Sequence, residues 1–426
     1  MKRFFALGLL VGCGFANLAF AENWPQWRGA KFDAISNEQN LPTTFSKTEG
    51  VLWRLPLPGP AGATPAVWDQ QIFLTSVEPD SGDLLLLCVG TDGKEQWRQK
   101  VATGSKNVRN DEGNYASPSP ATDGKHVWTL MGEGTLGCYT VTGEDVWKFN
   151  VADRYGKLEL AFGLASTPVL DGEKLYLQLI HGEGKAETRE AMVVALDKTT
   201  GKEIWKQPRP SDAKAECEHS YASPTLYRDD KTAFLLTHGA DVIVAHDLTD
   251  GHELFRYNLN TKGVYHDTLR FVASPVAVPG LIVAPSAKNY PVVALTPDAR
   301  GDVTESQNGV AWKLDSGTPD VPSPLVVGDY VYLCRENGNL ICLNRKTGEK
   351  LYEKTTTRDR HRASPVYADG LIYTSARNGV ITVTKAGPEF EIVSQNNMEE
   401  SISSSPAISN GRIYIRTFDA LYAIGN

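Results

Sequence analysis

The chain has 426 residues, of which 41% are hydrophobic and 22% charged, and its formal net charge is −8 at pH 7. This composition is typical of a globular protein and excludes a disordered or fibrous chain. An acidic chain without a long Lys/Arg run binds nucleic acid and anionic membrane surfaces poorly, so we expect neither as a partner.

The first 21 residues have the pattern of an export signal. A basic start and the apolar run 4–12 precede a small-x-small cleavage site at residues 19–21. The run is too short to span a bilayer, and no other apolar run in the sequence is long enough. A lipoprotein leader is the alternative, because residues 10–13 resemble a lipoprotein box whose Cys13 would carry a lipid anchor. Both interpretations export the protein to the periplasm or cell envelope, and the apolar residues after Cys13 favour simple cleavage.

A repeat organises the chain after residue 50. Eight occurrences of a small residue followed by Ser/Thr-Pro are spaced at intervals of 41 to 56 residues: Thr64-Pro65, Ser117-Pro118, Thr167-Pro168, Ser223-Pro224, Ser274-Pro275, Ser323-Pro324, Ser364-Pro365 and Ser405-Pro406. A Gly turn with an aromatic residue four positions later follows in most units: Gly93/Trp97, Gly143/Trp147, Gly201/Trp205, Gly251/Phe255 and Gly348/Tyr352. Trp312 holds the same place in the fifth unit after a longer turn.

Each unit has the pattern of four short strands. In the sixth unit the segments SPLVV, YVYLC, NLICLN and KLYEK are separated by turn residues, which is typical of an antiparallel meander. No segment sustains a helical period, so an α/β architecture is excluded. Eight units of four strands with a period near 50 predict an all-β, eight-bladed β-propeller of four-stranded antiparallel blades.

The two ends of the repeat predict how the propeller closes. The eighth unit stops after three strands at residues 421–424, and residues 51–54 (VLWR) resemble the fourth strand EIWK at residues 203–206. We therefore expect the N-terminal strand to complete the last blade, which removes two open sheet edges. The expected domains are a signal peptide (1–21), an N-terminal extension (22–50) and the propeller (51–426).

The repeat resembles a known family. The patterns SPxxxxxxxVYLxxxxGxLxxLxxxTGExxY and VVALDKTTGKEIW are similar to the PQQ-like propeller repeat. This family includes the propeller lipoprotein of the outer-membrane β-barrel assembly machinery and the quinoprotein alcohol dehydrogenases. The opening WPQWRG at residues 24–29 is similar to the start of many exported PQQ-like propellers. The resemblance covers roughly residues 50–425 and implies a fold more than a chemistry.

The resemblance also implies PQQ as a possible cofactor. Quinoprotein alcohol dehydrogenases carry an adjacent Cys-Cys pair against the quinone and hold Ca²⁺ in a cluster of oxygen ligands. This sequence has no adjacent cysteines, and none of its residues maps onto those ligands. We expect no cofactor and no metal, with PQQ kept as the alternative.

The cysteines beyond Cys13 are expected to be packing residues. When the units are aligned on their Gly turns, three of them (Cys88, Cys138 and Cys342) share a strand position with Ala195, Ala245, Ala294, Thr382 and Ala423. Small residues at one repeated position indicate tight packing between blades. A hairpin disulfide between Cys334 and Cys342 stays open, because a shift of one residue in the turn would place them on opposite faces.

Functional side chains are expected where loops enter the Ser/Thr-Pro strand. These loops contain Arg109, Asp111, Glu112, Asn114, Tyr115, His219, Tyr221, Tyr265, His266, Asp267, Arg270, Asp320, Arg358, Asp359, Arg360, His361, Arg362, Glu399 and Glu400. Loops between the second and third strands add His181, His238 and Lys288 to the same face. A solvated rim, a funnel for a polar or anionic ligand, and a His-based metal site all fit this pattern.

We select seven ligand-binding candidates and no catalytic or metal-binding residue: His219, Tyr221, His266, Arg270, Lys288, His361 and Arg362. The pattern favours an exported, non-enzymatic scaffold that binds a protein partner or a small polar or anionic ligand. A PQQ-dependent dehydrogenase or other redox enzyme is one alternative, and a carbohydrate- or polymer-binding module is another.

Overall fold

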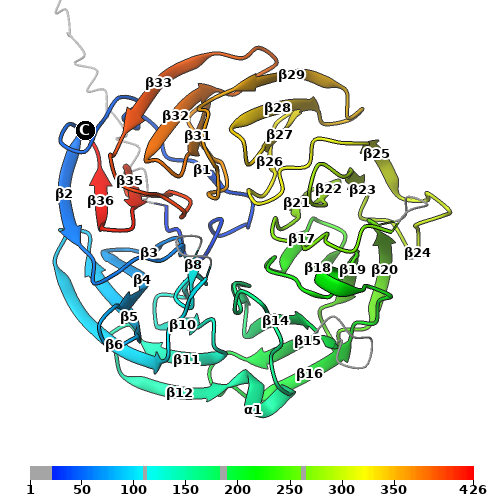
Figure 1. Cartoon of the computed structure of the whole chain (residues 1–426), viewed down its shortest axis with the longest axis horizontal. Helices are drawn as coiled ribbons and strands as arrows, with labels where there is room; N and C mark the ends of the chain where they lie inside the picture. The colour runs from blue at the N-terminus through cyan, green and yellow to red at the C-terminus, as the bar shows by residue number, and fades with distance from the viewer. Residues whose placement is uncertain (1–21, 109–112, 183–189, 261–264) are drawn as a thin grey trace, which may run out of the picture.

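The computed structural model describes residues 22–108, 113–182, 190–260 and 265–426. It consists of eight sheets arranged in a ring around a central axis (Figure 1), which confirms the expected eight-bladed propeller. The described residues include one short α-helix, α1 (Val151–Tyr155), and a 3₁₀ turn at Ala215–Glu218. The expected signal segment (1–21) and Cys13 lie outside the described residues, and none of the described helices is long and apolar enough to cross a membrane.

The first four blades follow each other along the chain. From the innermost strand outward they are β3 (Ala66–Trp68), β4 (Gln71–Glu78), β5 (Asp83–Gly90) and β6 (Glu95–Thr103); β9 (Ala121–Thr122), β10 (His126–Leu130), β11 (Thr135–Thr140) and β12 (Asp145–Asn150); β13 (Val169–Asp171), β14 (Lys174–His181), β15 (Glu190–Asp197) and β16 (Glu203–Pro208); and β17 (Thr225–Arg228), β18 (Ala233–Gly239), β19 (Val242–Asp247) and β20 (Glu253–Asn258).

The last four blades complete the ring. They are β21 (Val276–Val278), β22 (Leu281–Pro285), β23 (Val292–Leu295) and β25 (Val310–Leu314); β26 (Leu325–Val327), β27 (Tyr330–Cys334), β28 (Asn339–Asn344) and β29 (Lys350–Thr355); β30 (Val366–Ala368), β31 (Leu371–Ser375), β32 (Val380–Lys385) and β33 (Ile392–Asn397); and β34 (Ala407–Ser409), β35 (Arg412–Arg416), β36 (Ala420–Ile424) and β2 (Val51–Pro56). Short strands β1 (Ile35–Ser36) and β24 (Gly301–Asp302) add to the seventh and fourth blades, and β7 (Asn107–Val108) pairs with β8 (Gly113–Asn114).

The N-terminal strand closes the ring as expected. Strand β2 pairs antiparallel with β36, so that Val51 lies opposite Ile424, Trp53 opposite Ala423 and Arg54 opposite Tyr422. Figure 1 shows the blue strand β2 beside the red strand β36. The last blade is therefore built from both ends of the chain, and it leaves no gap in the ring.

The repeated Trp and Gly residues join neighbouring blades. Five tryptophans occupy equivalent outer-strand positions, and each indole lies against the turn glycine of the next blade: Trp53/Gly93, Trp97/Gly143, Trp147/Gly201, Trp205/Gly251 and Trp312/Gly348. Each indole N–H also donates to a backbone carbonyl of that next blade, at 2.8 to 3.3 Å. A side chain at the glycine would occupy the volume of the indole, so this contact between blades requires both the tryptophan and the glycine.

The structure confirms the alignment of the small buried residues. Each lies opposite the aromatic position of the outer strand, as Cys88 lies opposite Trp97, Cys138 opposite Trp147 and Cys342 opposite Tyr352. All five described cysteines are buried and free. Cys342 faces Tyr332, whereas Cys334 faces Leu340, so the two sulfurs share a sheet face but are out of register by two residues.

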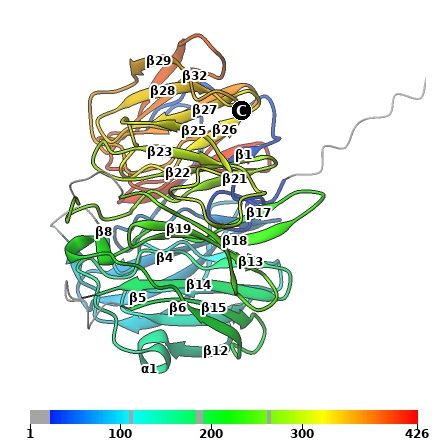
Figure 2. The same cartoon turned by 90° about the vertical axis from the view of Figure 1, so that its right-hand side faces the viewer.

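The N-terminal extension crosses the far face of the ring, where first and second strands are joined. Trp24 exchanges backbone hydrogen bonds with Val67, and the Gln26 amide bonds the backbone of Leu170. The buried Arg28 guanidinium donates to the carbonyl of Pro324 at 2.6 Å. These contacts reach the first, third and sixth blades, so the extension spans the end of the central channel. Figure 2 shows this dark-blue segment on the face opposite to β8.

Candidate functional site

A ring of Ser and Thr residues surrounds the axis of the propeller. Backbone N–H groups donate around the ring to the next hydroxyl at 2.8 to 3.1 Å, in the order Thr64, Ser119, Thr167, Ser223, Ser274, Ser323, Ser364 and Ser405. The repeat position in the second unit is therefore Ser119-Pro120, and our assignment of Ser117-Pro118 is wrong. The sequence holds both dipeptides in tandem, and only the hydrogen bonds of neighbouring blades distinguish them.

A second layer of residues lies above this ring, two positions earlier in each unit. Alternate residues of an extended segment point to the same side, so both layers face the channel. The second layer comprises Gly62, Ser117, Ala165, Tyr221, Val272, Val321, Arg362 and Ser403, all of which line the channel. Arg362 and Tyr221 are thus brought to the axis by the same register that places the Ser/Thr ring.

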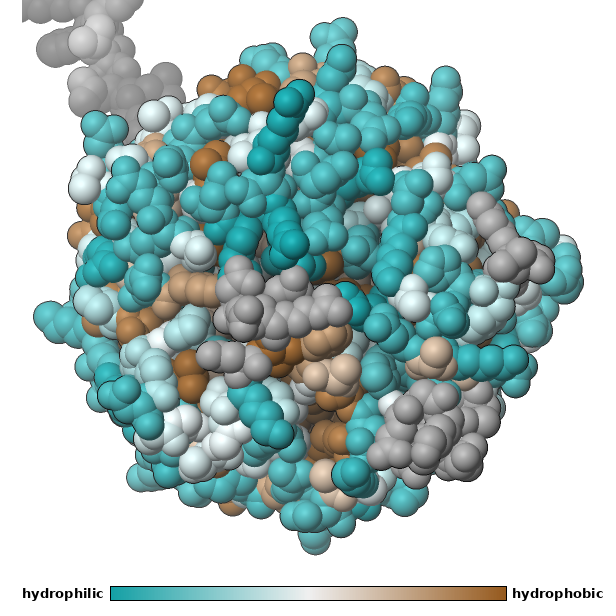
Figure 3. Space-filling view, viewed as in Figure 1, coloured by the Kyte–Doolittle hydropathy of each residue, from teal (hydrophilic) through white to brown (hydrophobic). Residues whose placement is uncertain are grey.

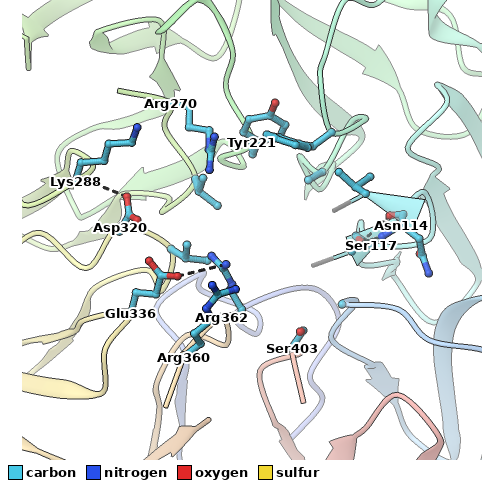
Figure 4. Close-up of a pocket in the computed structure, with 17 residues that line it drawn as sticks. Asn114, Ser117, Tyr221, Arg270, Lys288, Asp320, Glu336, Arg360, Arg362 and Ser403 are labelled. Carbon is cyan, nitrogen blue, oxygen red and sulfur yellow. Dashed lines mark hydrogen bonds and ion pairs between the residues drawn. The ribbon is translucent and has the colours of Figure 1, made fainter. Parts of the chain in front are cut away.

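The channel widens into a central cavity of about 440 Å³ at the loop face, where loops enter the innermost strands (Figure 4). One wall is charged and comes from the fifth, sixth and seventh blades: Arg270, Lys288, Asp320, Glu336, Arg360 and Arg362. The opposite wall contains Asn114, Ser117, Phe162, Ala165 and Tyr221. Figure 3 shows the same division, with hydrophilic side chains above the centre of this face and hydrophobic ones below it.

Arg270 has an ion-pair partner at the rim of the cavity. Its guanidinium lies 3.3 Å from the carboxylate of Glu216 and 5.1 Å from the centre of the Phe162 ring. The Phe162 ring in turn lies 5.7 Å from that of Tyr221. The Arg270 side chain is 21% exposed and that of Glu216 44%, so solvent screens this ion pair. The guanidinium therefore lies over an aromatic surface at the cavity mouth.

Two carboxyl groups lie among the other cations. Arg362 approaches Glu336 at 3.3 Å, and the backbone N–H of Lys288 donates to Asp320 at 3.0 Å. Burial raises the pKa of Glu336, the Arg362 charge opposes this shift, and a hydrogen bond with Asp320 adds to it. The Lys288 ammonium donates to the Thr268 hydroxyl at 2.8 Å. The wall is thus a mixed network in which four cations face two carboxyl groups.

The structure brings four of the seven candidates to the cavity: Tyr221, Arg270, Lys288 and Arg362. His219 lies in a separate depression, where its ring bonds the carbonyl of Gly182. The His266 ring packs edge-on against Tyr290, with ring centres 5.0 Å apart. His361 is fully buried, which lowers its pKa. None of these three histidines lines the central cavity.

The two histidines expected on second-to-third-strand loops belong to strands instead. His181 is the last residue of β14, and His238 lies inside β18. Both are buried, and burial lowers the pKa of His238 to about 3. Among the loop residues that the sequence places on this face, Arg109, Asp111 and Glu112 lie outside the described residues.

Several cavity residues are absent from the seven candidates. Arg360 precedes the ring residue Ser364 by four positions, as Arg270 precedes Ser274. The repeat register alone could therefore have placed Arg360 at the cavity. Asp320 and Asn114 belong to the polar loops but lack a distinguishing pattern. Glu336 and Phe162 come from loops whose sequence offers no signal, and only the folded arrangement brings them to the cavity.

The cavity residues do not fit a calcium–quinone site. Within the described ranges, the one group of three His, Asp or Glu side chains near enough to share a cation is Asp247, Asp250 and His252. It lies in the exposed turn between β19 and β20, away from the axis. Among the described residues that line the central cavity, the carboxylates are Asp320 and Glu336, and none of the described cysteines lines it. We therefore derive no chemistry through PQQ.

Solved structures share this architecture at low sequence identity. BamB from Moraxella catarrhalis is 16% identical, with a TM-score of 0.62 over 88% of this chain and 99% of that one. A europium-containing methanol dehydrogenase is 10% identical, with a TM-score of 0.68 over 94% and 90%. The quinohemoprotein alcohol dehydrogenase ADHIIG from Pseudomonas putida HK5 is 12% identical, with a TM-score of 0.64 over 94% and 80%. These similarities show the fold alone.

The family of the chain follows from its sequence. None of the curated proteins matches the chain. A family model matches residues 132–389, which is more than half of the chain and includes the second to seventh blades in whole or part. The chain therefore belongs to the PQQ-like propeller family described as outer membrane protein assembly factor BamB.

Proposed function

We propose that this propeller is a non-catalytic binding scaffold of the cell envelope, which receives an anionic group of a protein partner or small ligand in its central cavity. The observation that carries the proposal is the charged wall, where Arg270, Lys288, Arg360 and Arg362 converge at the channel mouth. In a chain of net charge −8, the four cations of this wall outnumber its two carboxyl groups, and this local excess of positive charge favours an anionic group.

The family supports a scaffold. Its description names an outer membrane protein assembly factor, and a BamB structure aligns over 88% of this chain. The export signal expected in residues 1–21 would deliver the chain to the same compartment. The far end of the channel is crossed by the N-terminal extension, so a ligand approaches from the loop face. The alternative of a redox enzyme is supported by the shared fold alone, because the described residues of the cavity do not form the ligand set expected of a quinoprotein.

Titration calorimetry with succinate, citrate and a Glu-rich peptide tests the proposal. The protein should bind at least one of these carboxylate probes, and Arg270→Ala should weaken binding at least tenfold, or about 1.4 kcal/mol. Arg228→Ala is the matched control, because Arg228 forms an ion pair with Asp171 at 2.8 Å on the far face. The melting temperature should change little in both variants, since both side chains are partly exposed.

Two outcomes would contradict the proposal. In the first, the wild-type protein binds none of the carboxylate probes at low ionic strength. In the second, Arg270→Ala binds as tightly as the wild type while Arg228→Ala does not. Either result would show that the charged wall serves the structure of the loops and that binding occurs elsewhere.

A further inference from the structure

The cavity continues downward into a narrow segment of the channel, here called the neck. All eight Ser/Thr ring residues line it, Arg362 and Tyr221 lie at its upper end, and Trp27 of the N-terminal extension lies at its lower end. The volume of the neck is about 130 Å³. A water molecule takes about 30 Å³ in the liquid, so the neck accommodates one small polyatomic ion or a few waters.

The hydroxyl groups of the ring have an incomplete set of hydrogen bonds. Seven of them, Ser119 through Ser405, accept an N–H bond from the preceding blade. Within the described ranges none of the eight donates its own hydrogen to a protein acceptor. Each ring residue is at most 6% exposed. Buried hydroxyls normally donate to a partner, so these hydrogens are available to whatever occupies the neck.

The neck also has a distinct electrostatic character. The described residues that line it include no carboxylate, and the one charged side chain among them is Arg362, whose guanidinium also faces Glu336 of the cavity at 3.3 Å. Each blade-to-blade N–H bond occupies one of the two lone pairs of a hydroxyl oxygen and leaves the O–H hydrogen free to donate. Donors arranged around an axis below a guanidinium suit a negative ion, whereas the positive charge of Arg362 would repel a cation.

We infer that the neck binds one small anion, or the anionic end of a ligand in the cavity, through ring hydroxyl hydrogens with Arg362 as the counter-charge. The inference deepens the proposed function. It rests on that function only where the neck holds the anionic end of a ligand, because a free inorganic ion can occupy the neck without one. The shared chemistry is that of a halide, phosphate or carboxylate, each of which accepts several hydrogen bonds at once.

Two halides serve as probes of the neck in the purified protein. Bromide diffused into crystals should give an anomalous peak on the axis between Arg362 and the Ser/Thr ring. Iodide in solution should quench a saturable fraction of the tryptophan fluorescence, because Trp27 lies at the bottom of the neck. Trp27→Phe should remove this saturable component and leave the linear, collisional quenching of the other tryptophans.

Two variants separate anion binding from blade packing. Arg362→Gln should weaken iodide binding at least tenfold. Thr64→Val should weaken it severalfold, because Thr64 is the ring residue whose hydroxyl accepts no blade-to-blade bond among the described residues. Thr129→Val is the matched control: it also removes a buried hydroxyl without a partner, but from β10 and away from the neck. This control should bind iodide as the wild type does.

Competition experiments identify the source of the anionic group. If succinate or the Glu-rich peptide displaces iodide, the neck holds the carboxylate end of a ligand; if only phosphate or halides compete, it holds a free inorganic ion. Both results support the inference. An axis without a bromide peak, together with purely linear quenching, would overturn it and leave a neck filled by water. Carboxylate binding by calorimetry would in that case still support the proposed function.

Discussion

The indole ring of Trp205 lies directly against Gly251 of the next blade. A Cβ atom added to Gly251 would lie 2.5 Å from Cε3 of that ring, and the backbone φ of Gly251 is +79°. The Trp205 N–H donates to the carbonyl of Leu248 in the same turn at 3.3 Å. The two residues repeated in most units therefore form one contact, which joins the outer strand of a blade to the turn of its neighbour.

Gly251→Ala should destabilise the protein by about 2–4 kcal/mol, because the methyl group strains the backbone and displaces the indole. Gly280→Ala is the matched control, since Gly280 has φ +81° but no heavy atom within 4 Å of an added Cβ. It should cost only about 1–2 kcal/mol, from the backbone conformation alone. Urea unfolding of both variants measures the difference. Equal losses would show that the Trp–Gly contact does not limit stability.

The repeat made the register of the third strands predictable. The eight small residues opposite the outer-strand aromatic position could be aligned because most units carry the same Gly turn at a fixed offset. The tandem dipeptides of Ser117 to Pro120 show the limit of such an alignment. Local sequence cannot distinguish them, because Ser119 is selected by its hydrogen bonds with Thr64 and Thr167 in the adjoining blades.

The site was predictable only where it follows the repeat. Arg270 and Arg362 precede ring residues by four and two positions, so the register carries them to the axis. The positions of His181 and His238 do not follow from the repeat register. Strands β14 and β18 extend further than the short strands of the sixth blade, and they include His181 and His238 as buried residues. Strand length depends on packing between blades, which the sequence of one unit does not specify.

Deletion of residues 22–56 should lower both the melting temperature and the solubility sharply. The deletion removes β2, which exposes the edge of β36, and it removes the buried Trp24 from the far face. Thermal unfolding and sedimentation provide the measurements. Deletion of residues 22–34 alone is the informative comparison, because it leaves β2 in place and should retain a closed ring. A fully shortened chain as stable as the intact one would contradict closure by β2.

The described cysteines should resist thiol reagents in the folded protein. Burial raises the pKa of Cys88, Cys138, Cys217 and Cys334 to about 12 and that of Cys342 to about 11. A chain carrying Cys13→Ser should therefore show no reaction with Ellman's reagent at pH 8, and five thiols should react after unfolding in urea. Rapid labelling of the folded protein would indicate that one of these positions is accessible.

The buried histidines should make the protein sensitive to acid. Burial lowers the pKa of His238 from 6.5 to about 3 and that of His246 to about 4, and the Arg209 charge adds to both shifts. The unfolded chain therefore binds more protons than the folded one as the pH falls below 6.5. Stability is complete above that pH and declines toward pH 4, by up to about 1.4 kcal/mol per pH unit for each histidine.

Urea unfolding between pH 7 and pH 4 measures how steeply the free energy of unfolding falls with pH. His238→Gln should reduce this slope by the contribution of one proton, up to about 1.4 kcal/mol per pH unit. The backbone N–H of His238 bonds the side chain of Gln178, and a glutamine at position 238 keeps that backbone contact. His252→Gln is the matched control, because His252 is exposed and Asp250 raises its pKa. This control should not reduce the loss of stability toward acid. An unchanged slope in His238→Gln would show that His238 does not remain neutral in the folded protein as the pH falls.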